Sequence, residues 1–220
     1  MKKKGTMEEL ALNTGCKFLM NFSSFSFIFI GDTHGFLNDF IKQKEIIEQV
    51  NPEFVLAEQL QDIVLDSKKS FLEIVDKRYI SELVDFEHVE QLIKLCDKKN
   101  IKLVGMDIKD FGYEKGIRNI ILGKRKPTKE EEKAVEKIVE KREMHQLRAI
   151  QKYAKMTKKP IVIITGCWHL REDSSILKSL DRYLVVYPSD GNGNLITEKP
   201  KDITKITYRN LVKNGTIRQA

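Results

Sequence analysis

Five short apolar runs, spaced widely along the chain, constrain the fold more than any other feature of this sequence. Each run is rich in branched or aromatic side chains and carries few polar residues. Strands that are buried on both faces have this composition, and they are typical of parallel sheets covered by helices. The runs are FSFIFI (25–30), FVLA (54–57), IKLVGM (101–106), IVIIT (161–165) and YLVVY (183–187).

Helical patterns lie between these runs. Residues 36–50 and 86–98 repeat apolar side chains at helical spacing, and Thr128 with Glu131 forms a capping-box signature that predicts a helix from about 129 to 157. The alternation predicts an α/β fold with a mostly parallel central sheet flanked by helices. Sheets of this kind bind ligands beyond the carboxyl ends of their strands.

The length of 220 residues suits one domain. We expect a single α/β domain over residues 1–220, with its core at about 25–187. Residues 1–22 are interpreted as an N-terminal extension. Residues 188–220 are interpreted as a tail that includes a C-terminal edge strand.

Composition narrows the list of partners. The net charge of +7 comes from lysines and arginines that are mixed with 32 acidic residues, which is typical of a solvated surface and predicts no nucleic-acid partner. No apolar run approaches the ~18 residues of a membrane span, so no membrane partner and a cytoplasmic location are expected. Three widely spaced cysteines argue against disulfides and against a CxxC zinc site. The sequence leaves the oligomeric state open.

Two strand ends carry the same motif. FIFIGDTHGF and IVIITGCWHL each place a glycine after an apolar strand and a histidine three residues later, at His34 and His169. Glycine allows a sharp turn off the strand, and the histidine then lies where a helix begins. The repeat predicts two related halves, each contributing a strand-GxxH-helix unit.

Glu58 follows the second apolar run, so its carboxylate is expected at the same edge of the sheet as His34 and His169. Two neutral imidazoles and a carboxylate suit a divalent ion of the Mn, Co or Zn class. Such an ion lowers the pKa of bound water and polarises carbonyl groups, so hydrolysis is the natural chemistry.

Three other residues near the strand ends keep open roles. Asp32 is interpreted as a helix cap or as a group that orients a ligand histidine. Asp107 follows the third run and is either a site residue or an ordinary strand-end acid. Cys167 lies inside the second motif and is interpreted as a packed residue, with a thiolate ligand as the alternative.

Arg142 lies at the centre of the apolar arc of the long helix, between Val139 and Ala149 on a helical wheel. A buried arginine is costly unless it meets a carboxylate or another acceptor. Arg142 is therefore predicted to reach the site, either to stabilise developing negative charge or to pair with Glu58 and hold it in place.

The order of these motifs, from about residue 25 to 187, resembles the TraB/Tiki superfamily, which also groups erythromycin-esterase-like and ChaN-like proteins. The resemblance rests on the two GxxH motifs, on NPEFVLAEQL and on the arginine in KREMHQL. It implies a site of His34, Glu58, Arg142 and His169 in an α/β fold. GDTHG also resembles the opening motif of calcineurin-type phosphoesterases, but the later motifs of that family are absent from the sequence.

The resulting hypothesis is a metal-dependent hydrolase that acts on an amide or ester bond of a small-molecule or peptide substrate. Its catalytic residues would be His34, Glu58, Arg142 and His169, and its metal ligands His34, Glu58 and His169. The alternative is a protein of the same fold that binds haem, a metal or another small ligand without turnover. A calcineurin-like phosphoesterase is the third reading.

Overall fold

The computed structural model describes residues 22–32, 37–171, 173–189 and 207–212. In this part of the chain seven strands form one sheet, in the order β3-β4-β2-β5-β1-β6-β7. The strands are β1 (Phe27–Asp32), β2 (Phe54–Ala57), β3 (Val64–Leu65), β4 (Lys102–Gly105), β5 (Ile161–Gly166), β6 (Tyr183–Ser189) and β7 (Thr207–Val212).

The five central strands of the sheet run parallel, and β3 and β7 pair antiparallel at its two edges. This arrangement confirms the predicted α/β fold with a mostly parallel central sheet. The five runs read from the sequence match β1, β2, β4, β5 and β6, and each observed end lies within two residues of its predicted position.

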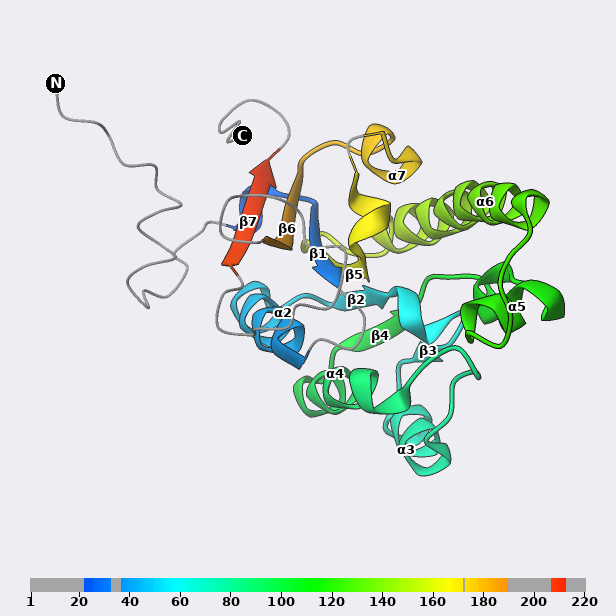
Figure 1. Ribbon diagram of the computed structural model, residues 1–220. Helices are drawn as coiled ribbons and strands as arrows, with labels where there is room; N and C mark the ends of the chain where they lie inside the picture. The colour runs from blue at the N-terminus through cyan, green and yellow to red at the C-terminus, as the bar shows by residue number, and fades with distance from the viewer. Residues whose placement is uncertain (1–21, 33–36, 172, 190–206, 213–220) are drawn as a thin grey trace, which may run out of the picture.

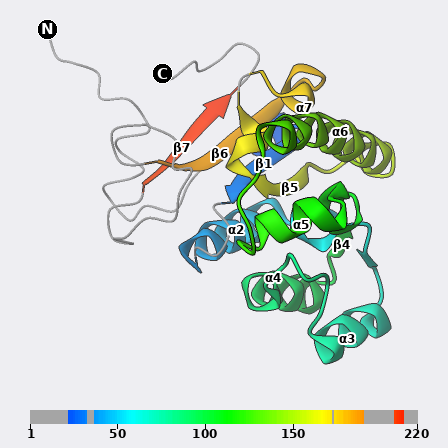
Figure 2. The same cartoon turned by 45° about the vertical axis from the view of Figure 1, so that its right-hand side comes forward.

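Helices cover both faces of the sheet (Figures 1 and 2). Helices α2 and α4 pack on one face, and α6 and α7 pack on the other. The helices are α2 (Leu37–Val50), α3 (Lys68–Lys77), α4 (Phe86–Lys99), α5 (Lys115–Ile121), α6 (Lys129–Ala154) and α7 (Ser175–Lys178), with 3-10 turns η1 (Phe22–Ser24), η2 (Glu58–Leu60), η3 (Lys109–Gly112) and η4 (Cys167–Leu170).

The core has two halves because successive strand residues point to opposite faces. In β1, Ile28 and Ile30 join the cluster under α2 and α4, whereas Phe27 and Phe29 join the cluster under α6 and α7. All six residues of β1 are buried. The continuous apolar runs of the sequence therefore follow from burial on both faces.

Helix α6 begins with the predicted capping box, in which Thr128 and Glu131 each bond the other's backbone N–H. It ends at Ala154 rather than at about 157, and Met156 beyond it is 56% exposed. The last turn tightens there, because the amides of Lys155 and Met156 donate to the carbonyls of Lys152 and Tyr153, three residues back. No helix within the described ranges is both long and apolar enough to cross a bilayer.

Gly105, the last residue of β4, is crossed closely by the chain that leaves η2. A Cβ atom built on Gly105 would lie 2.7 Å from the amide nitrogen of Ile63 and 2.8 Å from the carbonyl carbon of Leu60. Both neighbours are backbone atoms, and the Gly105 N–H also donates to the Ile63 carbonyl at 2.5 Å. Only glycine allows the segment after Glu58 to lie this close to β4.

We expect Gly105→Ala to lower the free energy of unfolding by about 1–3 kcal/mol, because the backbone at 60–63 must move to admit the methyl group. Urea unfolding followed by circular dichroism measures this change. Gly116→Ala is the control, since its nearest neighbour to a new Cβ is the flexible Arg125 side chain at 3.7 Å and the site is helical. A Gly105→Ala protein as stable as Gly116→Ala would contradict the close approach.

Candidate functional site

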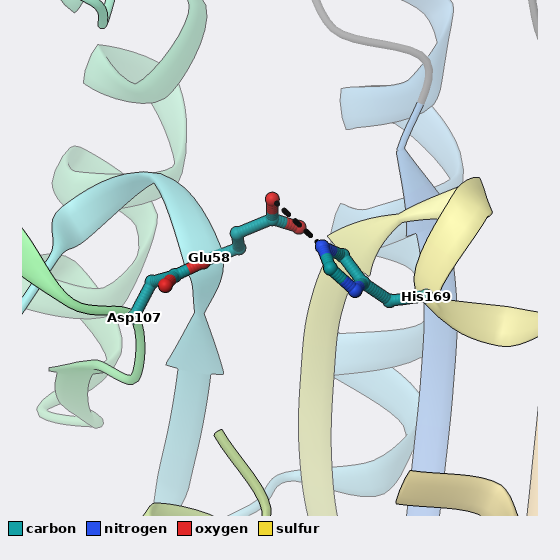
Figure 3. Close-up of side chains that lie close together, drawn as sticks. All are labelled: Glu58, Asp107 and His169. Atoms are coloured by element: carbon teal, nitrogen blue, oxygen red, sulfur yellow. Dashed lines mark ion pairs between the residues drawn. The ribbon is translucent and has the colours of Figure 1, made fainter. Parts of the chain in front are cut away.

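Three potential metal ligands meet at the carboxyl edge of the parallel strands. Glu58 directly follows β2, Asp107 lies two residues after β4, and His169 lies in η4 after β5. One ligand atom from each of these side chains lies within 4.8 Å of the others, and all three residues are buried. Figure 3 shows their side chains converging, with the ion pair of Glu58 and His169 dashed.

The carboxylate of Glu58 is held on both oxygens. Its Oε2 accepts hydrogen bonds from the Thr165 hydroxyl at 2.7 Å and from the Gly166 amide at 2.5 Å. Its Oε1 accepts from Arg142 Nη2 at 2.5 Å and lies 3.5 Å from His169 Nε2. These contacts join the end of β2 to the end of β5, its neighbour in the sheet.

Arg142 reaches this edge from the middle of α6 and is 6% exposed. Its Nε and Nη2 donate to Asp107 Oδ2 at 3.0 and 2.7 Å, and Nη2 also donates to Glu58 Oε1. The guanidinium carbon lies 4.7 Å from the ring centre of Phe111 and 5.8 Å from that of Tyr113. The planar cation is therefore paired at its edge and stacked on its face, as arginine favours.

His169 lies between two carboxylates. Its Nε2 faces Glu58, and its Nδ1 lies 3.2 Å from Glu143 Oε1. Glu143 is fully buried and also accepts from Arg171 Nη1 at 2.5 Å and from the Ser175 amide at 3.1 Å. The ring is thus fixed at both nitrogens.

These surroundings shift the pKa values of the buried groups. Burial lowers the pKa of His169, but the charge of Glu58 and the hydrogen bond to Glu143 outweigh burial and raise it to about 9. Burial raises the pKa of Glu143, but its bonds from His169 and Arg171 leave it below its usual value. Burial lowers the pKa of Arg142, and the charges of Glu58 and Asp107 reverse that effect and raise it.

The cluster balances its charges at neutral pH. With His169 protonated, three buried carboxylates face three cations, and the sum of these formal charges is zero; Arg171 also pairs with the exposed Asp173 at 2.9 Å. Buried charges are tolerated when they are paired and hydrogen-bonded in this way. The members are Glu58, Asp107, Glu143, Arg142, Arg171 and His169.

Strained backbone lies beside the cluster in the turns after β2 and β4. Gln61 and Asp62 have positive φ angles of 47° and 53°, and Asp110 and Phe111 have 51° and 53°. This conformation is uncommon for residues other than glycine, and rarer for bulky ones such as Phe111. The Asp110 amide donates to Gln61 Oε1 at 2.7 Å, so the two turns support each other. Strain of this kind concentrates at functional sites.

The structure brings together three of the four residues predicted for the site, namely Glu58, Arg142 and His169. His34 lies outside the described residues. Asp107, whose role the sequence left open, joins the cluster. Asp32 ends β1 and accepts from Gln59 Nε2 at 2.5 Å.

The second GxxH motif forms the predicted strand and turn, with η4 and then the short helix α7 after the glycine. Cys167 is buried, as expected for a packed residue, whereas the neighbouring Trp168 is 61% exposed. The Trp168 ring lies 5.7 Å from the guanidinium of Arg171.

Glu143 and Arg171, which belong to the cluster, and Gln146, which contacts it, were not identified from the sequence. Glu143 and Gln146 are both fully buried on α6, and Gln146 Nε2 donates to Asp107 Oδ2 at 2.7 Å. The available signal was helical spacing. Gln146 lies four residues after Arg142, and Glu143 lies four residues before the buried Leu147. The Oε1 atom of Gln146 is buried without a hydrogen-bond partner among the described residues.

A cavity of about 220 Å³ lies at the opposite, amino edge of the sheet, away from the cluster. The first residues of β1 and β5 line it, together with exposed lysines that are typical of a solvated surface. The converging charged side chains, rather than this cavity, define the candidate site.

Comparisons with known proteins bear on the fold. No family model matches the sequence, and no curated protein matches it. Among solved structures, the fold is similar to that of ChaN from Campylobacter jejuni, described for its cofacial haem binding. The match has a TM-score of 0.50 and 14% identity, and it covers 87% of this chain and 89% of that one. The chain therefore has a ChaN-like fold, and the wider TraB/Tiki resemblance stays a prediction.

Replacing Arg142 should destabilise the protein strongly. We expect Arg142→Gln to cost about 3–5 kcal/mol of unfolding free energy, because two buried carboxylates lose their cation. Arg125→Gln is the matched control, since Arg125 pairs with Glu131 on the surface and should cost much less. Equal stability of the wild type and Arg142→Gln in urea titrations would show that the guanidinium does not hold the carboxylates.

His169 should make stability depend on pH. Its folded pKa of about 9 lies above the ordinary 6.5, so its contribution is complete below about pH 6.5 and is lost as the pH rises through about 9. In chelator-treated protein, the stability advantage of wild type over His169→Gln should shrink by on the order of 3 kcal/mol across that window. Denaturant titrations at several pH values measure it, and a constant difference would contradict the raised pKa.

Proposed function

We propose that this protein binds a divalent metal ion of the Mn, Co or Zn class through Glu58, Asp107 and His169. The observation that carries the proposal is the convergence of their ligand atoms, within 4.8 Å of one another, at the carboxyl ends of β2, β4 and β5. Ligands bind at this edge of parallel α/β sheets. Two carboxylates and one imidazole are a donor set that suits first-row divalent ions.

The surroundings of these donors favour an ion over a bulky ligand. Glu58 is 3% exposed, His169 is 3% exposed and Asp107 is fully buried. Arg142 Nη2 lies 2.5 Å from Glu58 Oε1 and 2.7 Å from Asp107 Oδ2, so an ion held by both oxygens would require the guanidinium to move aside. His169 would bind the ion in its neutral form, so uptake would release a proton. His34 remains a ligand predicted from the sequence.

Hydrolysis of an amide or ester bond is a more specific function that we propose for the same site. A bound ion would supply an activated water and polarise a carbonyl group. Arg142 would then be the residue that stabilises developing negative charge. The near-complete burial of the three donors favours ion binding without turnover. A small-molecule or peptide substrate is larger than an ion and would need a wider opening to reach them.

Direct ion binding tests the main proposal. Chelator-treated wild-type protein, titrated calorimetrically with Mn²⁺, Co²⁺ or Zn²⁺, should take up one ion per chain. Asp107→Asn and His169→Gln should each abolish or strongly weaken uptake, because each removes a ligand. A metal-dependent esterase or amidase activity lost with the same changes would extend the proposal to hydrolysis.

An exposed pair with the same chemistry provides the control. His145 Nε2 lies 3.2 Å from Asp62 Oδ1 on the surface, and the two side chains are 37% and 55% exposed. His145→Gln should leave ion uptake unchanged. If His169→Gln bound the ion as tightly as wild type does, the proposed site would be wrong.

Haem is the second candidate ligand. The ChaN structure that shares this fold binds haem, and Tyr113 offers a suitable axial ligand in this chain. Its hydroxyl accepts from Arg142 Nη1 at 3.4 Å, so it lies beside the charged cluster. Tyrosinate is a known axial ligand of haem iron.

A haem titration separates this candidate from the first. If haem is the ligand, wild-type protein should give a saturable Soret band, and Tyr113→Phe should weaken binding markedly without loss of fold. Tyr79→Phe is the matched control, because Tyr79 is 61% exposed and lies outside the cluster. Unchanged haem affinity in Tyr113→Phe would exclude Tyr113 as the axial ligand.

A further inference from the structure

Glu143 is adjacent to Arg142 on α6 but contacts different residues. Arg142 turns toward Glu58 and Asp107, whereas Glu143 turns toward η4 and α7 and contacts His169, Arg171 and the Ser175 amide. Glu143 is fully buried, and it is not part of the group of donors that converge on one point. Its carboxylate thus lies at the Nδ1 side of the imidazole ring, whereas Glu58 lies at the Nε2 side.

We propose that Glu143 is the positioning residue of the metal site, which holds His169 so that Nε2 is the nitrogen that binds the ion. This inference rests on the metal site proposed above. A neutral imidazole carries one proton, and the hydrogen bond made by one nitrogen decides which nitrogen is free to ligate. Glu143 accepts from Nδ1 at 3.2 Å, so the proton belongs on Nδ1 and the lone pair belongs on Nε2.

The geometry on the other side of the ring agrees with this assignment. Nε2 of His169 is directed to Glu58 Oε1 at 3.5 Å, toward the point where the three potential ligands converge. Nδ1 faces Glu143 instead. Turning the ring by 180° about its Cβ–Cγ bond would direct carbon Cδ2 to Glu143 and carbon Cε1 to Glu58, so both contacts would be lost and the buried Glu143 carboxylate would have fewer donors.

Glu143 is itself held in place, so it fixes the ring rather than following it. Arg171 Nη1 donates to its Oε1 at 2.5 Å, and the Ser175 amide at the start of α7 donates to its Oε2 at 3.1 Å. Two donors, from the segment after η4 and from α7, therefore hold the carboxylate independently of the His169 ring. Carboxylates that receive the second nitrogen of a ligand histidine raise its basicity and orient it, and their loss weakens metal binding by about 10–100-fold.

Ion affinity in four proteins tests the inference. Chelator-treated wild type, Glu143→Gln, Arg171→Gln and Glu90→Gln are titrated with Mn²⁺ by calorimetry. Glu143→Gln keeps the shape of the side chain and should lose about 10–100-fold in affinity. Arg171→Gln leaves the carboxylate but removes one of its supports, so it should lose less. Glu90→Gln breaks a surface ion pair with Arg78 and should bind as wild type does.

A spectroscopic signature separates positioning from a general loss of structure. In nitrogen-15 spectra of the metal-free protein, the Nδ1 proton of His169 should be protected from exchange in wild type and in Glu90→Gln. It should exchange faster in Glu143→Gln, whose amide oxygen is a weaker acceptor, and freely in Glu143→Ala. Circular dichroism of each variant establishes that the fold is retained.

The outcomes distinguish the two proposals. If wild type binds Mn²⁺ and Glu143→Gln binds it equally well with the same Nδ1 proton signal, the positioning role is overturned and the metal site stands. If wild type binds none of the divalent ions, the metal site fails and the role of Glu143 in it falls as well. Weaker binding in Glu143→Gln together with an altered Nδ1 signal supports both.

Discussion

The buried guanidinium of Arg142 is the constraint on which the rest of the site depends. It lies between Glu58 and Asp107, two carboxylates that follow neighbouring strands, and it comes from a helix on one face of the sheet. An unpaired buried charge is costly, so β2, β4 and α6 must keep one relative position for the ion pairs to form. The charges thereby specify how the helical layer sits on the sheet, which apolar packing alone defines less sharply.

Much of the fold was predictable because its signals are local. Strands buried on both faces give continuous apolar runs, and Thr128 with Glu131 marks the start of α6. Among the site residues, Glu58 and His169 followed from their positions at strand ends, and Arg142 followed from a helical wheel that placed a charge on a buried face. Each inference used one element and one rule.

The other members of the site depend on contacts between distant elements. A single acid after a strand, such as Asp107, has many uses, and its role appears only when Arg142 and Gln146 reach it from 35 and 39 residues away. Glu143 shares a helical stripe with buried Leu147, yet its partners lie on η4 and α7. The left-handed turn at Phe111 has no local sequence signal either, because tertiary contacts impose that conformation.

The order of strands has a consequence for how the protein assembles during synthesis. Strand β5 lies between β1 and β2 although it follows both of them by more than a hundred residues. Pairings across such separations close late, because a long loop must be ordered first. In a chain emerging from the ribosome, Glu58 is therefore synthesised before the Thr165 hydroxyl and the Gly166 amide that donate to its carboxylate. The charged cluster is completed only when β5 enters the middle of the sheet, which makes its closure a late, cooperative step of folding.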